Sequence, residues 1–543
     1  MVQPGMDFCQ GGAGSVVVQF SPQNHFGSPV IGFIFHSHCL FPPFLVVYPK
    51  RGKTFCRKKR GKEKKLFFSL QSLARCGRMM IEHKLGGRMM DHLHINVNFA
   101  SPMGKIKPMH SVNNGPAALR GNGNTEFFAD AGIPFARTHD ANFAPQYGAP
   151  HTVDIIAVFP NFDADETDPA SYDFHLTDEY MENIMAVGSK VFFRLGNKIE
   201  HESKRYGALP PKDFAKWARI CEYIIRHFNE GWGNGHHYGM EYFEIWNEPD
   251  LHPQCWDGPE EDYFELYEIA ARHLKACFPH LKIGGPAVTS MGNRDYVERF
   301  LKYISRNPDD LVPMDFFSFH LYTTNPEKMV GHVKLARKLL DEHGYTETET
   351  ILNEWNYVRN WTPREEILYS YRVIPSLKGS AFVNACMLAC QHSSLDHLMY
   401  YDARVSAGWN GLFDHISQEP LKPYYAIWDF NRLYKLATEV ACEVEGDDLY
   451  ALAATNGEEA AILLTYYKDH KSIDGSGTEE EMRRVRIDWS GFASGDGVEV
   501  EYRFLDAGND NRVVAAETFF GETGAHIFDL PLYTSILVTL KKK

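Results

Sequence analysis

The stretch FEIWNEPDL, Phe243 to Leu251, changes character in its middle. Its first residues are mostly apolar and resemble a buried strand, whereas Asn247, Glu248 and Pro249 are polar or interrupt regular structure. A strand that ends in this way places a carboxylate at the edge of a sheet. The same change, from an apolar run to a polar terminus, recurs along the chain and indicates the fold.

Short apolar runs alternate with longer helix-like segments from about residue 105 onward. Eight runs are predicted as strands: KIKPMHSVN (105–113), GIPFARTHD (132–140), KVFFRLG (190–196), YFEIWNE (242–248), LKIGGPA (281–287), DFFSFHLY (315–322), TILNEWN (350–356) and HLMYYDA (397–403). Strand–helix alternation with largely apolar strands indicates a parallel sheet covered by helices. Eight such units favour a (β/α)8 barrel of the TIM type, in the α/β class, over an open doubly wound sheet.

Helical spacing supports this reading between the runs. Segments 176–188, 211–230, 262–278 and 364–378 are predicted as helices, and Pro375 is expected to kink or end the last one. The long segment 154–174, after the second run, is expected to form a hairpin of its own.

After about residue 437 helical spacing disappears and strand-like runs follow, separated by Gly, Asp and Asn turns. We therefore predict three parts: an extension over 1–89, a catalytic barrel over 90–436 and a β-sandwich over 437–543. The strand-like run 92–99 precedes the barrel and is expected to join the sandwich.

The extension differs from the rest in charge. Residues 1–89 hold 14 Lys/Arg and 3 Asp/Glu, a net of +11, so the remainder of this −14 chain carries −25. The basic run 50–65 suits either an arm for nucleic acid or anionic lipid, or a disordered or non-native leader, and we favour the leader, with a working start near Met89. The apolar run 30–48 contains His36, His38 and a Pro-Pro pair, which are poor in a spanning helix.

The bulk composition excludes several classes of function. An acidic body argues against nucleic-acid binding, which needs cations facing phosphates. The ten cysteines are scattered without a Cys-x-x-Cys pair, which indicates reduced thiols in a cytoplasmic protein and no zinc site. We expect no metal, no cofactor and no membrane partner, and the composition leaves a homo-oligomer open. The adjacent histidines His236 and His237 are read as part of a loop before the fourth strand.

Polar residues gather at the ends of the predicted strands. In (β/α)8 barrels the active site lies at the carboxyl ends of the strands. The residues there are His110, Asn113, Arg137, His139, Asp140, Arg194, Asn247, Glu248, His320, Tyr322, Asn353, Glu354, Trp355, Tyr401 and Asp402. Glu248 ends the fourth strand and Glu354 the seventh, so the two carboxylates are expected to converge across the mouth. Such a pair is what glycoside hydrolysis requires, and the sequence alone permits retention or inversion.

Two motifs carry a resemblance to a known family. Ile245-Trp246-Asn247-Glu248-Pro249 resembles the acid/base motif of the clan A glycoside hydrolases, and Leu352-Asn353-Glu354-Trp355-Asn356 resembles their nucleophile strand. With FARTHD, DFHLTDEY, KIGGPA, DFFSFHLY and PLKPYYAIWDF, the chain from about residue 92 resembles glycoside hydrolase family 39, which includes β-xylosidases and α-L-iduronidases. The resemblance implies retaining chemistry, with Glu248 as acid and then base and Glu354 as nucleophile.

The remaining candidates have roles suited to a sugar. Asn247 is expected to bind the 2-hydroxyl, and Arg137 or Tyr322 to donate to Glu354. His139 and His320 could hold ring hydroxyls, and Trp409 could stack on a sugar face; a core histidine and a packing tryptophan remain the alternatives for His320 and Trp409. The sequence thus predicts a retaining glycosidase acting on β-xylosides or related glycosides. The alternatives are a transglycosidase and a non-catalytic carbohydrate-binding protein.

Overall fold

A computed structural model describes residues 92–116, 123–139, 152–201, 203–405, 407–470 and 481–543. The prediction for residues 1–89 lies outside the described residues, and so does Asp140.

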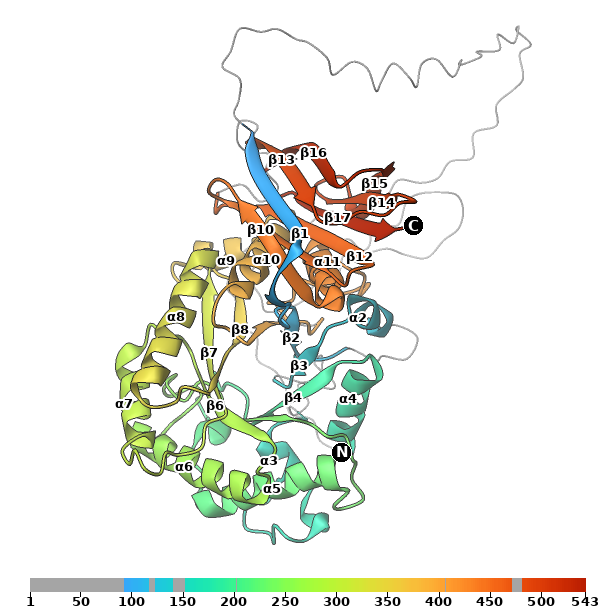
Figure 1. Cartoon of the computed structure of the whole chain (residues 1–543). Coiled ribbons are helices and arrows are strands. Elements are labelled where there is room, and N and C mark those ends of the chain that lie inside the picture. The colour runs from blue at the N-terminus through green and yellow to red at the C-terminus, as the bar shows by residue number, and fades with distance from the viewer. Residues whose placement is uncertain (1–91, 117–122, 140–151, 202, 406, 471–480) are drawn as a thin grey trace, which may run out of the picture. The chain divides into compact units, whose positions relative to one another are not determined.

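Eight parallel strands close into a barrel, as predicted (Figure 1). They are β2 (Ser111–Asn113), β3 (Phe135–Arg137), β4 (Lys190–Leu195), β5 (Tyr242–Ile245), β6 (Lys282–Val288), β7 (Phe316–Thr323), β8 (Glu349–Tyr357) and β9 (His397–Tyr400). Closure comes from pairing of β2 with β9, where Val112 lies opposite Tyr400. The first strand is shorter than expected, because Lys105 already belongs to a strand of the other sheet.

Helices follow the strands and cover the barrel. They are α2 (Thr125–Ala131), α3 (Ile155–Val158), α4 (His175–Ala186), α5 (Phe214–Glu230), α6 (Glu260–Cys277), α7 (Arg294–Ile304), α8 (Pro326–Glu342), α9 (Arg364–Val373), α10 (Leu377–Gln391) and α11 (Lys422–Leu436). In α5, Asp213 caps the first turn by accepting from the Lys216 amide, and Trp217, Ile224 and Phe228 are buried on one face. The predicted break at Pro375 is confirmed, since α9 ends at Val373 and α10 begins at Leu377.

The hairpin expected over residues 154–174 is wrong. The segment holds α3 and a 3-10 turn, Pro169–Ser171, and no strand. Its aspartates satisfy the backbone locally: the side chains of Asp165 and Asp168 accept from the amides of Thr167 and Ala170. Such local bonds compete with the ladder that a hairpin would need.

The C-terminal region forms a second, mostly antiparallel sheet of nine strands. Its order is β15 (Asp510–Phe519), β14 (Val498–Leu505), β17 (Ser535–Lys542), β12 (Glu459–Tyr466), β11 (Leu449–Thr455), β10 (Thr438–Val444), β1 (Leu93–Lys105), β13 (Met482–Ser490) and β16 (Thr523–Pro531). β1 runs between β10 and β13 (Figure 1). The ring of Tyr502 in β14 lies 4.4 Å from that of His526 in β16, so the two ends of the sheet face each other as in a sandwich.

This sheet packs on the last two barrel helices. Asn384 in α10 donates to the Ser535 hydroxyl at 3.0 Å, and Asn511 donates to the Asp429 carboxylate in α11 at 2.7 Å. Among the described residues, no single helix has the length and apolar character to cross a membrane; α9 and α10 reach it only as a pair bent by 82°.

Candidate active site

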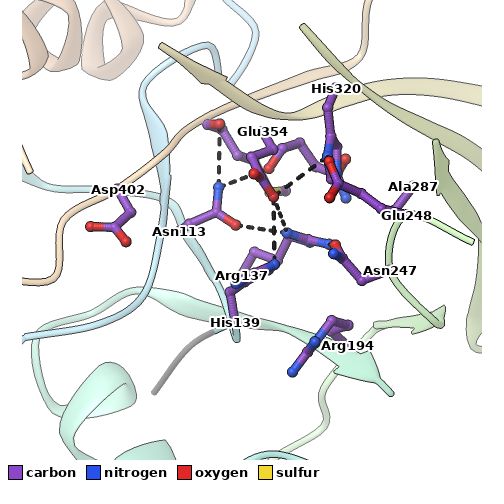
Figure 2. A network of polar contacts seen from close by, with 12 residues as sticks. Asn113, Arg137, His139, Arg194, Asn247, Glu248, Ala287, His320, Glu354 and Asp402 are labelled. Carbon is purple, nitrogen blue, oxygen red and sulfur yellow. Dashed lines mark hydrogen bonds and ion pairs between the residues drawn. The ribbon is translucent and has the colours of Figure 1, made fainter. Parts of the chain in front are cut away.

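The two predicted carboxylates meet at the carboxyl ends of β5 and β8 (Figure 2). Glu248 follows β5 in a left-handed backbone conformation, with φ 47°, and its amide donates to the Ala287 carbonyl at 2.9 Å. Trp246, two residues earlier, also has a positive φ of 74°. Non-glycine residues adopt this conformation at a cost and often do so at functional sites, because it aims a side chain that a regular strand would turn away.

His320, in β7, lies between the two carboxylates. Its Nδ1 is 2.9 Å from Glu248 Oε1 and 3.5 Å from Glu354 Oε2. One ligand atom from each of Glu248, His320 and Glu354 lies within 4.8 Å of the others, so the carboxylates are close neighbours. Burial lowers the pKa of His320, which favours a neutral ring.

Glu354 is held from several sides. The Tyr322 hydroxyl donates to Oε1 at 2.5 Å, Arg137 Nη1 donates to Oε2 at 3.3 Å, and His139 Nε2 lies 3.5 Å from Oε2. Burial raises the pKa of Glu354; the neighbouring His320 lowers it, and the charge of Glu248 raises it further. Burial of Tyr322 and, to a smaller extent, the charge of Glu354 raise the pKa of Tyr322 well above its ordinary value. Tyr322 therefore stays protonated and remains a hydrogen-bond donor.

Arg137 is fully buried and organises the site from below. Its Nε donates to Glu244 Oε2 at 2.8 Å, and its Nη2 donates to Asn247 Oδ1 at 2.7 Å. Nη1 also donates to Asn113 Oδ1 at 2.9 Å. Burial would lower the pKa of Arg137, but the charges of Glu244 and Glu354 outweigh it and raise that pKa.

The strand-end rule missed Glu244. It lies inside β5, one layer beneath the rim, and is 0% exposed. The signal was present: a carboxylate within the short apolar run YFEI needs a buried cation or several donors. Besides Arg137, the Ser318 hydroxyl and the Asn353 amide donate to its Oε1, at 2.6 and 2.5 Å.

A cavity of about 720 Å³ opens over the carboxylates. Seven of the predicted residues line it: His139, Asn247, Glu248, Tyr322, Glu354, Tyr401 and Trp409. Arg137 and His320 are not among the lining residues and support the site from behind, so His320 faces Glu248 and not the open cavity. The sequence reasoning missed Trp361 and Arg359 on the lining, because both lie in the loop after β8 where no strand end marks them.

Trp409 belongs to an aromatic cluster at the edge of this cavity. Its ring centroid lies 4.9 Å from that of Tyr371, and 5.5 Å from those of Tyr322 and Trp361. Trp361 is 53% exposed, which leaves an aromatic face open to a ligand. Both the packing and the stacking roles weighed for Trp409 are therefore compatible with its place.

Four strand-end residues do not join the carboxylates. Trp355 packs on the rings of Phe382 and Tyr400. His110 packs on the rings of Phe430 and Tyr434, and burial lowers its pKa to about 3. Arg194, which no dashed line joins to the carboxylates in Figure 2, donates to Asp154 at 2.7 Å. Asp402 accepts from the Arg404 amide at 2.9 Å and from Asn114 Nδ2 at 3.3 Å.

Known proteins share this fold and part of the sequence. Residues 94–359 match the model of the family described as glycosyl hydrolases family 39. A β-xylosidase of Geobacillus stearothermophilus is 26% identical over 234 residues, which are 37% of this chain and 44% of that protein. A β-xylosidase of Caldicellulosiruptor saccharolyticus is 30% identical over 164 residues, 28% of this chain and 32% of that protein. The aligned part therefore spans less than half the length of these curated relatives.

Solved structures show the same architecture over a larger part of the chain. A glucosidase from Croceicoccus marinus superposes with a TM-score of 0.70 and 21% identity, covering 83% of this chain and 99% of that one. This likeness supports the two-part fold, and the sequence matches confirm the resemblance seen in the motifs. Residues 94–359, just under half of the chain, are thus similar to glycosyl hydrolases family 39.

Proposed function

We propose that the protein is a retaining glycoside hydrolase that acts on β-xylosides or related glycosides. One observation carries the mechanism: oxygen atoms of Glu248 and Glu354 lie within 4.8 Å of each other. Retaining pairs stand about 5–5.5 Å apart and inverting pairs about 6.5–9.5 Å, because inversion needs room for a water. The short oxygen–oxygen distance supports the closer, retaining arrangement, in which one carboxylate attacks the anomeric carbon directly.

The donors around Glu354 support our assignment of the two roles. Glu354 receives hydrogen bonds from Arg137 and Tyr322, and both favour its ionised form. Burial and the charge of Glu248 disfavour two charges side by side, and because Arg137 and Tyr322 donate to Glu354, we assign the acid role to Glu248. Glu248 is then the acid, and Glu354 the nucleophile.

The reaction follows in two steps. Glu248 gives its proton to the leaving oxygen while Glu354 bonds to the anomeric carbon, and the aglycone departs. Glu248, now ionised, takes a proton from a water that attacks the same carbon, and Glu354 is released. His320 Nδ1 lies against Glu248 Oε1 and holds it in place through both steps.

The residues that line the cavity are the ones that we assign to bind the sugar. The Oδ1 of Asn247 accepts from Arg137, which fixes the amide and leaves its Nδ2 to donate to the 2-hydroxyl. His139 lies beside Glu354 and is placed to hold a ring hydroxyl. Trp409 and Trp361 offer flat faces for a sugar ring. The β-xyloside assignment comes from the two aligned β-xylosidases.

The first test is turnover of a panel of 4-nitrophenyl glycosides, the β-xyloside first, by the full chain and by a Glu354→Gln variant. We expect release from one glycone by the wild type and loss of several orders of magnitude in the variant. Release that is equal in both proteins would place the nucleophile elsewhere. No release from any glycoside by a folded wild type would favour the carbohydrate-binding alternative.

The stereochemistry needs a separate measurement. Proton NMR of the first-formed sugar should show the anomer of the substrate if the mechanism is retaining, and the opposite anomer would exclude the covalent route. Excess xylose or methanol as acceptor distinguishes hydrolysis from transglycosylation by the fraction of product that carries the acceptor.

A further inference from the structure

We propose that Asp178, His227 and His236 form a binding site for a divalent transition-metal ion, best suited to Zn²⁺, on the helical layer of the barrel. Asp178 lies in α4, His227 near the end of α5, and His236 in the loop that leads to β5. One ligand atom from each lies within 4.8 Å of the others. None of these residues lines the cavity over Glu248 and Glu354.

The two ring nitrogens of His227 both face oxygens. Nδ1 is 2.9 Å from the Trp232 carbonyl, and Nε2 is 2.9 Å from Asp178 Oδ1. A neutral imidazole can donate from only one nitrogen. When Nδ1–H donates to the carbonyl, Nε2 directs a lone pair at a carboxylate, and a cation bound between them satisfies both. An Nδ1 held by a backbone carbonyl is also how proteins orient metal-binding histidines.

His236 adds a second nitrogen to the same carboxylate. Its Nε2 lies 3.3 Å from Asp178 Oδ1 and is a buried atom with no hydrogen bond to any described residue. Two imidazole nitrogens and one carboxylate oxygen, without a thiolate, suit Zn²⁺ and similar borderline ions. Ca²⁺ and Mg²⁺ prefer oxygen ligands throughout, so they fit this set poorly.

The loop Gly-Asn-Gly-His is shaped to bring His236 to the helix. The His236 amide donates to the His227 carbonyl at 2.6 Å, and a Cβ on Gly235 would lie only 2.1 Å from that carbonyl oxygen. Only glycine permits this approach. The ring of His227 stacks on Phe174 with centroids 3.6 Å apart, which fixes its orientation. The ligand atoms are thus placed by backbone and packing before any ion binds.

In two comparable clusters, an arginine already lies beside the carboxylate. In the group Glu222, His273 and Cys277, Arg226 already lies 2.8 Å from the carboxylate. At the catalytic pair, Arg137 lies 3.3 Å from Glu354. Within the described ranges, Asp178 pairs with no lysine or arginine, and the two histidines beside it carry a charge only when they are protonated. A divalent ion would therefore meet an anion that no fixed cation neutralises.

The test is metal binding by the full chain, without an affinity tag and stripped of metal, measured by isothermal titration with Zn²⁺ and then Ca²⁺. We expect one Zn²⁺ site per chain, and no response to Ca²⁺. His236→Ala should weaken Zn²⁺ binding by at least about tenfold. His237→Ala is the matched control, because its histidine is adjacent and exposed, and binding should be unchanged.

Asp178→Asn provides a second variant that keeps the shape of the side chain, in case His236→Ala does not fold. Co²⁺ added in place of Zn²⁺ should give visible absorption bands in the wild type and lose them in Asp178→Asn. Absence of Zn²⁺ binding in the wild type, or equal binding in the wild type and both site variants, would overturn the proposal. Equal losses in His236→Ala and His237→Ala would also overturn it.

Discussion

The hydrogen bond from Tyr322 to Glu354 gives the sharpest prediction of the proposed mechanism. Tyr322→Phe removes one hydroxyl at 2.5 Å from Glu354 Oε1 and keeps the ring that packs on Trp361 and Trp409. A hydrogen bond to a charged group contributes about 1.5–3 kcal/mol. At 1.36 kcal/mol for each factor of ten, this free energy corresponds to a fall in kcat/KM of about 10-fold to 150-fold, which is the largest fall we expect.

The pH dependence should change in a defined direction. The hydroxyl lowers the pKa of Glu354 against the burial that raises it, so its loss raises that pKa further. Glu354 must be ionised to attack, and the acidic limb of the kcat/KM profile should therefore move to higher pH. The assay is kcat/KM for the best 4-nitrophenyl glycoside between pH 4 and 9, with the chain checked for folding by circular dichroism.

Tyr371→Phe is the control for this experiment. Its ring also packs on Trp409, at 4.9 Å, and it makes no described hydrogen bond to Glu354. The control should keep the wild-type profile. A Tyr322→Phe protein with kcat/KM within about twofold of wild type and an unmoved acidic limb would refute the role given to this hydroxyl.

Three further predictions concern other parts of the chain. Burial raises the pKa of Asp429 from 3.8 to about 8, so the folded state keeps a proton that the unfolded chain loses, and stability falls as pH rises across that window. Asp429→Asn keeps an acceptor for Asn511 and should flatten this slope, with a higher Tm than wild type at pH 8 and a similar Tm at pH 5; identical slopes would contradict the assignment. Trp409→Ala should raise KM about two- to twelvefold and leave kcat little changed, because ring stacking contributes about 0.5–1.5 kcal/mol. An unaltered KM would mean that Trp409 serves only in packing. Gly235→Ala should lower Tm because its Cβ would meet the His227 carbonyl at 2.1 Å, and an unchanged Tm would show that the loop can move away.

Local patterns determined the barrel and its two carboxylates. Most barrel strands are short apolar runs with a polar terminus, as in YFEI followed by Asn247 and Glu248, and both features lie within a few residues. Because parallel strands in a barrel end on one face, the sequence positions of Glu248 and Glu354 were enough to predict that they converge. The same reasoning failed for 154–174, where aspartate side chains accept backbone hydrogen bonds in place of a strand partner.

Only the tertiary structure decided what surrounds those carboxylates. The buried pair of Arg137 and Glu244 joins β3 to β5, and no local pattern states which cation meets which anion. The closeness of the Glu248 and Glu354 oxygens depends on barrel closure and on the left-handed backbone at Glu248, which the sequence alone does not reveal. The approach of His236 to Asp178 likewise joins residues that are 58 positions apart in the sequence, through the close passage at Gly235. A sequence specifies which residues are available for such contacts, whereas distances between elements arise only when the whole barrel has packed.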